Sequence, residues 1–366
     1  MLRELILENN HGALITFIPD NELGEKNEKR ERQKLDEIKT HLTKAQLEEI
    51  IATDDKLKAR QAAADPPEAL ATIPLLNISD IEAKSKEYPL EVQKEDMVEY
   101  LWTDVPTNGI TYLSLYFDAS VISQSDIQYA MLLLDILGSI DTEKRKYSDL
   151  INLTDLNTGG IYYNLNAVGK ENNIEEYVPL FTVSVKCLNS KLSETVGILR
   201  EILTGMCFDN RQRLRDLLAE TKSSAELAIL RSPHTVMFSR LKSYILPVAA
   251  YNDQKVLPYY YFVSELLGDF ENKFEVIRER LTSVSKRLFN RHNLKIGITA
   301  PAKDQSFIKK NVESLLNALD NAAQASTVHE FKCSPLNEGL MISSQVQYVG
   351  KAGNFRSLDK GYKFNG

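Results

Sequence analysis

The sequence changes its character near residue 90, and this change constrains the fold more than any other feature. From residue 24 to about residue 60 the chain is rich in Glu, Lys, Gln and Ala, and its apolar residues form narrow stripes at helical spacing. After residue 90, short apolar strands alternate with amphipathic helices. That alternation is typical of an α+β or α/β domain and not of a helical bundle. We therefore expect a charged helical segment followed by one large mixed domain.

The charged stretch predicts two helices. Thr43 is followed three residues later by Gln46, which is the spacing of a capping box, so the second helix should begin at Thr43. We expect residues 24–62 to form an exposed antiparallel hairpin that turns next to Thr43. Asp65-Pro66-Pro67 should end it, because proline has no amide hydrogen for a helical bond, and residues 73–89 should follow as an extended crossing segment.

The elements of the large domain are predicted from periodicity and turn residues. Strands at 97–102 and 110–118 are expected to pair, joined by a turn at Thr107-Asn108-Gly109. The other expected strands are 161–168, 178–188 and 294–298, and the expected helices include 126–137, 144–156, 211–231, 257–267 and 307–323.

Both ends of the sequence contain strand-like runs. Residues 14–18 are mostly apolar and are followed by Pro19-Asp20, so they predict a strand remnant. Residues 328–366 also read as strands, most clearly at 339–349. We expect a fragment whose tail either packs on its own domain or pairs with a neighbouring molecule, because strands without covering partners are unstable.

Composition excludes several classes of function. A net charge of −7 argues against nucleic acid as a partner, because phosphate binding needs clustered Lys and Arg. No run approaches the ~20 apolar residues of a membrane span, and the N-terminus lacks a signal core. We expect a soluble protein that is cytoplasmic in a bacterium and binds no membrane. Cys187, Cys207 and Cys333 lack metal-ligand spacing and are expected to be reduced.

We nominate no catalytic, cofactor-binding or metal-ligating residue. A phosphate loop and a Gly-x-Ser-x-Gly elbow are absent from the sequence. A zinc site assembled from distant histidines is the alternative, but a lone histidine is more often a hydrogen-bonded or surface residue. No two histidines are spaced three or four residues apart, the spacing of a local zinc motif, among His11, His41, His234, His292 and His329.

Two motifs have both a functional and a structural interpretation. Gly159-Gly160 lies between a predicted helix and a predicted strand, where glycine could admit another chain, but a helix C-cap is the favoured interpretation. Tyr259-Tyr260-Tyr261-Phe262 could line a peptide cavity, but aromatic residues at helical spacing are more often core.

The order and spacing of several motifs resemble the third domain of presequence proteases. Pro233-His234 with Arg240-Leu241 also resembles that family's pattern, and residues 73–81 resemble its interdomain linker. No single motif is specific, so their shared order carries the resemblance. The domain motifs are Thr107-Asn108-Gly109-Ile110-Thr111-Tyr112, Tyr147-Ser148-Asp149-Leu150, Thr158-Gly159-Gly160-Ile161, Val185-Lys186-Cys187-Leu188 and Phe208-Asp209-Asn210-Arg211-Gln212-Arg213-Leu214.

The resemblance implies a member of the pitrilysin and insulinase clan, of the falcilysin and presequence protease type. In that clan, four homologous domains form two halves that close around a peptide-filled chamber. Each is an α+β sandwich like that of mitochondrial processing peptidase, with an antiparallel sheet covered by helices. The first domain supplies the inverted zinc motif His-x-x-Glu-His, in which zinc activates water and the glutamate acts as base. That motif is absent here, as is the arginine and tyrosine pair of the fourth domain.

The resemblance also divides the chain and implies a function. We expect a non-catalytic portion of a zinc metalloendopeptidase that degrades short unfolded peptides, forming chamber wall and hinge. Zinc would belong to the parent enzyme, and the partners would be the missing zinc-binding N-terminal half and the rest of the C-terminal half. A eukaryotic source would imply an organelle matrix. The alternative is a stand-alone, non-catalytic scaffold or assembly subunit of peptidase ancestry. The expected parts are the end of a preceding domain (1–20), a helical hairpin linker and crossing segment (21–89), the third domain (90–326) and the opening strands of an incomplete fourth domain (327–366).

Overall fold

The chain divides into two compact units, Met1–Ser85 and Lys86–Gly366, which are described separately. The computed structural model describes residues 3–84, 87–170, 173–334, 336–342 and 346–354.

Unit 1 consists of helices joined by irregular chain. Nearly every described side chain in it is exposed, as expected for a stretch in which charges surround narrow apolar stripes. The strand predicted at 14–18 is wrong, because residues 9–20 have no regular structure and no described strand lies beside them to supply ladder hydrogen bonds. The helical elements are η1 (Arg3–Leu7), α1 (Leu23–His41), α2 (Lys44–Ala62), α3 (Pro67–Leu70) and η2 (Ile78–Asp80).

The capping box predicted at Thr43 is confirmed. The Thr43 Oγ1 accepts a hydrogen bond from the Gln46 amide at 3.3 Å, and the Thr43 amide donates to Gln46 Oε1 at 2.9 Å. Two of the amides that a helix N-terminus leaves without intrahelical partners are thereby satisfied. The α2 helix begins at the next residue, Lys44.

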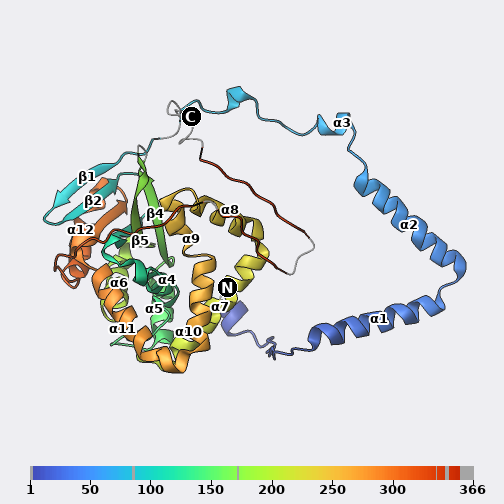
Figure 1. The fold of residues 1–366 in the computed structure, drawn as a ribbon, viewed down its shortest axis with the longest axis horizontal. Coiled ribbons are helices and arrows are strands. Elements are labelled where there is room, and N and C mark those ends of the chain that lie inside the picture. Colours follow the sequence, from blue (N-terminus) through green and yellow to red (C-terminus); the bar gives the residue numbers. More distant parts are fainter. Residues whose placement is uncertain (1–2, 85–86, 171–172, 335, 343–345, 355–366) are drawn as a thin grey trace. The chain divides into compact units, whose positions relative to one another are not determined.

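The two long helices do not form the antiparallel hairpin that the sequence predicted. Leu42 and Thr43 both have extended backbone, with ψ of 131° and 161°, and α2 leaves this joint at an open angle to α1 (Figure 1). The apolar stripes therefore stay in solvent, as Leu35 and Ile50 do. Narrow stripes bury too little area to bring two helices together along their lengths.

Unit 2 is built on one six-stranded sheet with the strand order β1-β2-β6-β3-β5-β4. The predicted α+β class is confirmed, with one parallel pair, β2 with β6, in an otherwise antiparallel sheet. The strands are β1 (Glu91–Glu95), β2 (Val98–Thr103), β3 (Ile110–Asp118), β4 (Ile161–Lys170), β5 (Asn173–Leu188) and β6 (Leu294–Thr299).

The predicted pairing of β2 with β3 is wrong, although the turn between them exists. Asn108 and Gly109 have φ of 52° and 81°, the left-handed backbone of a tight turn. Strand β6 nevertheless lies between β2 and β3, since Ile298 is opposite both Trp102 and Leu113. The turn therefore starts β3 without closing a hairpin, and β2 turns back onto β1, a strand that the sequence did not indicate.

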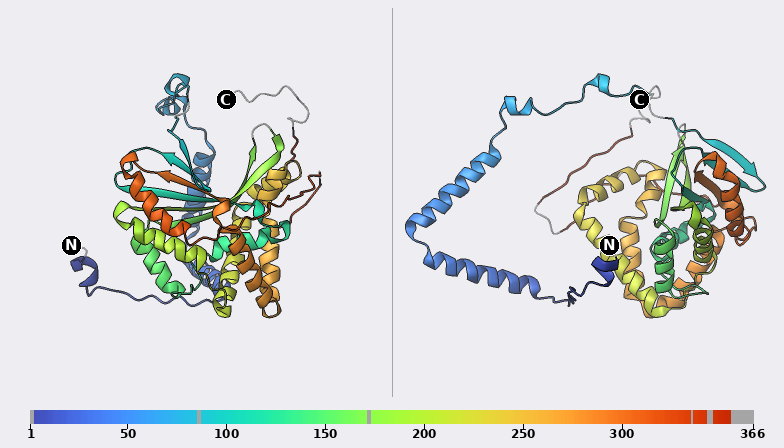
Figure 2. Two further views of the ribbon diagram at one scale, coloured as in Figure 1. Left: turned by 90° about the vertical axis from the view of Figure 1, so that its left-hand side faces the viewer. Right: turned by 180° about the vertical axis from the view of Figure 1, so that it is seen from behind.

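Helices cover one face of the sheet, and the core lies between the two layers (Figure 2). Phe289, at the end of α11, contacts the rings of Phe117 and Phe181 edge to face, with centroids 5.2 and 5.5 Å apart. The predicted helices are found within a few residues, except that the last ends early, at Leu316. The helices are α4 (Ile127–Ile136), α5 (Tyr147–Asn157), α6 (Leu192–Thr204), α7 (Arg211–Arg231), α8 (Pro233–Ser243), α9 (Pro247–Asp253), α10 (Leu257–Gly268), α11 (Phe270–Leu288) and α12 (Gln305–Leu316).

The C-terminal segment follows the helices without forming the predicted strands. At 339–349 the described residues, 339–342 and 346–349, have no strand structure, while 355–366 lie outside the described residues. Residues 326–350 instead make side-chain contacts with the rest of unit 2. This agrees with the first of the two expected alternatives for the tail, while association between molecules stays a prediction.

Replacing Thr43 with alanine should destabilise the start of α2. The substitution removes the side-chain acceptor for the Gln46 amide and should cost about 0.5–2 kcal/mol of local helix stability. Faster hydrogen exchange of the first-turn amides of α2 would report the loss. Thr53→Ala is the matched control, because Thr53 lies inside the same helix and alanine is the better helix former there. Equal effects of the two substitutions would contradict the role of the cap.

Candidate functional site

The second face of the sheet carries no layer of helices, and its side chains are different in kind from those of the core. Successive side chains of a strand point to opposite faces. In β3, Leu113, Leu115 and Phe117 are buried under the helices. Tyr112 and the alternate residues after it therefore lie on the other side, which we name the open face.

Strand register arranges the open face in rows that cross the sheet. Each row joins residues that are direct partners on neighbouring strands, so its members lie side by side. The first row contains Glu99, Lys295, Tyr116, Thr182 and Asn164; the second contains Leu101, Gly297, Ser114, Ser184 and Tyr162; the third contains Thr103, Thr299, Tyr112 and Lys186.

The centre of the open face is neutral and polar. Ser114 Oγ and Ser184 Oγ lie 2.9 Å apart and share a hydrogen bond. The ring of Tyr116 lies over Gly297, where an added Cβ would be 2.9 Å from Tyr116 Cε2. Gly297 therefore makes the space that the ring occupies.

Tyrosine rings and charged groups lie around this centre. Tyr112 and Tyr162 expose 43% and 63% of their surfaces. Lys295 donates to a Glu99 carboxylate oxygen at 3.0 Å, and this hydrogen bond lowers the pKa of Glu99 despite the opposing effect of burial. The open face thus combines solvent-accessible aromatic rings with hydroxyl and amide groups, and most of its charge is confined to one corner.

The residues of the open face can bind but do not form a set for bond cleavage. Its two central serines bond to each other, and the rows contain no histidine that could act as a base. No group of three or more His, Cys, Asp or Glu residues in the described ranges could hold a metal ion. What the open face offers is hydrogen-bond donors and acceptors for backbone amides, and rings for side chains.

The structure places both motifs with two interpretations in structural roles. Tyr259 is 8% exposed and its hydroxyl donates to Asp135, so this ring belongs to the core. The C-cap of α5 is Thr158, and Gly159 comes directly after it. The Gly159 amide donates to the Lys186 carbonyl at 2.7 Å, and the Lys186 side chain packs where a Cβ would be. The close approach at Gly159 therefore serves a strand of the same unit.

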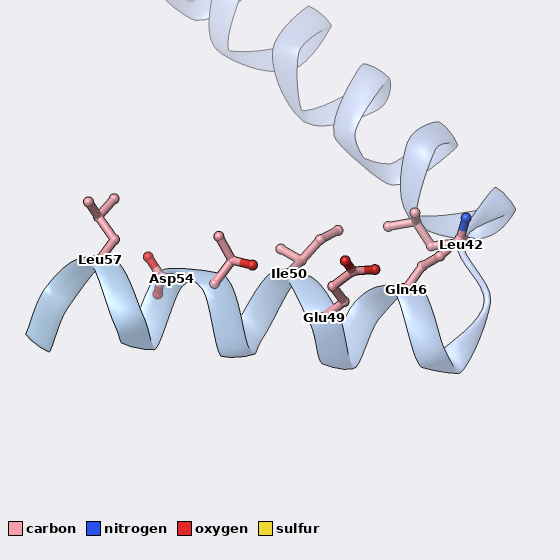
Figure 3. A pocket seen from close by; sticks show the side chains of 7 residues that line it. Leu42, Gln46, Glu49, Ile50, Asp54 and Leu57 are labelled. Carbon is pink, nitrogen blue, oxygen red and sulfur yellow. The ribbon is translucent and has the colours of Figure 1, made fainter.

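A shallow depression in unit 1 lies on the side of α2 that faces the joint with α1 (Figure 3). Apart from Leu42, its lining comes only from α2, and includes Ile50, Asp54 and Leu57. A depression formed by a single exposed helix has no convergent polar groups, so we assign it no binding site.

No helix among the described residues is both long enough and apolar enough to cross a membrane.

A family model for the region associated with peptidases of family M16, subfamily C, matches residues 17–266, well over half of the chain. The chain therefore belongs to this subfamily C associated family of the M16 peptidases. The match includes most of the helical segment of unit 1 and the sheet of unit 2 as far as β5, so it confirms the resemblance to the presequence protease type.

Relatives of known name agree with this assignment. The chain is 30% identical to Protein HypA of Clostridium perfringens over 368 residues, covering 100% of this chain and 37% of that protein. It is 27% identical to presequence protease 1, chloroplastic/mitochondrial, of Arabidopsis thaliana over 372 residues, covering 100% of this chain and 34% of that protein. The chain thus spans about a third of the length of the curated relatives it matches.

Among solved structures, the chain is similar to a peptidase M16 inactive domain from Pseudomonas fluorescens. The TM-score is 0.44 and the identity 11%, with 66% of this chain and 53% of that chain covered.

Gly297→Ala should destabilise unit 2, because the new methyl group meets the Tyr116 ring in a packed row. We expect a loss of about 1–3 kcal/mol in the free energy of unfolding, measured by urea denaturation. Gly197→Ala is the matched control, since Gly197 lies within α6 with no atom within 4 Å of an added Cβ. It should stabilise by about 0.4–1 kcal/mol. Equal stabilisation by both changes would contradict the packing of Tyr116 on Gly297.

Proposed function

We propose that this chain is a non-catalytic portion of a zinc metalloendopeptidase that degrades short unfolded peptides, and that it contributes chamber wall and hinge. Membership of the subfamily C associated family and the similarity to presequence proteases support the peptidase ancestry. The open face of the sheet is the observation that carries the proposed role, because it is a large surface of unit 2 on which side chains can receive a ligand.

The chemistry of the open face suits peptides of varied sequence. An unfolded peptide exposes backbone amides and carbonyls, which the Ser, Thr and Asn side chains of the open face can bind. Tyr112 and Tyr162 supply apolar surface together with a hydroxyl, which allows contact with many kinds of side chain. A chamber wall of this kind holds a substrate without requiring a defined motif.

Unit 1 fits the proposed role of connector. It separates from unit 2 as its own compact unit, and its two long helices are highly charged and exposed. We propose that 21–89 link the halves of the parent enzyme, that 1–20 end its preceding domain and that 327–366 begin its fourth domain. The parent enzyme would work in the cytoplasm of a bacterium or in an organelle matrix.

The residues present do not fit a zinc site, so we assign this chain no step in peptide hydrolysis. Zinc ligands converge as sets of three or four His, Cys, Asp or Glu side chains, and the described ranges contain no such group. In the proposed parent enzyme, the N-terminal half would supply the metal and the base. The purified chain should accordingly contain no stoichiometric zinc by elemental analysis, and chelator-sensitive peptide cleavage by it would contradict this assignment.

Binding of a labelled unstructured peptide, measured by fluorescence anisotropy, tests the proposed chamber wall. Tyr112→Ala and Tyr162→Ala should each raise Kd by about two- to tenfold, the loss expected for one aromatic contact. Tyr261→Ala is the matched control, because Tyr261 is 60% exposed but lies on α10, within the helical layer. An equal rise for all three variants, or no rise for Tyr112→Ala and Tyr162→Ala, would reject the open face as the peptide surface.

A further inference from the structure

The C-terminal segment, residues 326–350, is held by side chains although its described residues form neither strand nor helix. In Figure 1 the dark red chain runs beside α8. An extended chain loses conformational freedom when it is held on a surface, so it stays there only if specific contacts compensate. The structure shows such contacts at separate places along the segment.

The first contact fixes the beginning of the segment to the loop before α4. The Thr327 Oγ1 donates to the carbonyl of Ser120 at 2.7 Å, and a ring nitrogen of His329 lies 2.7 Å from the carbonyl of Ile122. The His329 ring also lies against Tyr251, with centroids 5.6 Å apart. These contacts bring the chain to the corner where α8 and α9 meet.

The second contact is an ion pair between Glu338 and Arg240 of α8. The Glu338 carboxylate accepts hydrogen bonds from Arg240 Nε at 3.0 Å and Nη2 at 3.3 Å, and from the Tyr244 hydroxyl. The hydrogen bonds from Arg240 and then Tyr244 hold the pKa of Glu338 below its ordinary value. Two guanidinium nitrogens on one carboxylate form the forked geometry that distinguishes arginine from lysine.

Arg240 is oriented from its other side by a buried carboxylate. Asp253 is 1% exposed and accepts from Arg240 Nη1 at 2.6 Å and from Ser239 Oγ at 2.7 Å. Asp253 belongs to α9 and Arg240 to α8, so the orientation of the guanidinium is built into the helix pair. The Nε and Nη2 edge therefore faces outward whether or not a ligand is present.

The third contact lies beyond Glu338 and continues along α8. The ring of Tyr348 lies 5.6 Å from that of His234, centroid to centroid. Gly350 packs on Met237 and Leu241, where an added Cβ would be 2.6 Å from Leu241 Cδ1. The chain is thus held on both sides of the ion pair.

We propose that Arg240 and Tyr244 form a carboxylate-binding site for an extended chain, and that its ligand is Glu338 of this same chain. Asp253 is a positioning residue, because it acts on the carboxylate only through Arg240. The segment then acts as a strap across α8, with Glu338 as its anchor and the contacts of His329 and Tyr348 as supports.

Limited proteolysis of the full chain by chymotrypsin tests the strap, with the initial rate of cleavage at Leu340 and Tyr348 as the readout. Glu338→Gln keeps the size of the side chain but removes its charge, and cleavage should become roughly three- to tenfold faster, as expected for a partly exposed charge-assisted contact. Glu330→Gln is the matched control, because Glu330 lies in the same segment and contacts Gln124 through its backbone amide. Its cleavage rate should stay that of the unmodified chain.

Tyr244→Phe provides a second, independent measurement. It removes one donor to Glu338 and leaves the pair of Arg240 with Asp253, whereas Arg240→Gln would leave Asp253 buried without its cation. Tyr244→Phe should accelerate cleavage less than Glu338→Gln, and the double variant should be no faster than Glu338→Gln alone, because both changes affect one contact. Equal rates for Glu338→Gln and Glu330→Gln, or fully multiplicative effects in the double variant, would overturn the proposal.

Discussion

The alternation of side chains along a strand is the constraint on which unit 2 depends. Each central strand places apolar residues on the helical side and polar or aromatic residues on the other, so one short sequence builds the core and the open face together. A shift of register by one residue would exchange the two faces. The stability of the core therefore also fixes the position of every side chain on the open face.

Local signals account for what could be predicted from the sequence. The capping box at Thr43, the turn at Asn108 and most helices of unit 2 were predicted correctly, because each depends on residues that are close in the chain. The insertion of β6 between β2 and β3 could not be predicted in the same way. It depends on pairing between residues such as Trp102 and Ile298, and periodicity carries no information on which strands become neighbours.

The errors at the two ends of the chain have a common physical cause. Residues 14–18 and 339–349 are composed like strands, but strand structure requires a partner, and β propensity expresses the fit to such a surface more than a preference of the backbone. The open face was missed for a related reason. The alternation of Tyr112, Ser114 and Tyr116 is visible in the sequence, but the rows that join them to Lys186 and Gly297 exist only once the register is known.

The position of β6 has a consequence for how the sheet is made during synthesis. Strands β3, β4 and β5 can pair as soon as they leave the ribosome, while β1 and β2 can pair only with each other. The two groups cannot join until the long run of helices before β6 has also been made. Until then the facing edges of β2 and β3 have unpaired backbone groups, and such edges are prone to aggregate. Nascent chains that stop before β6 should therefore depend on chaperones more than the finished sheet does.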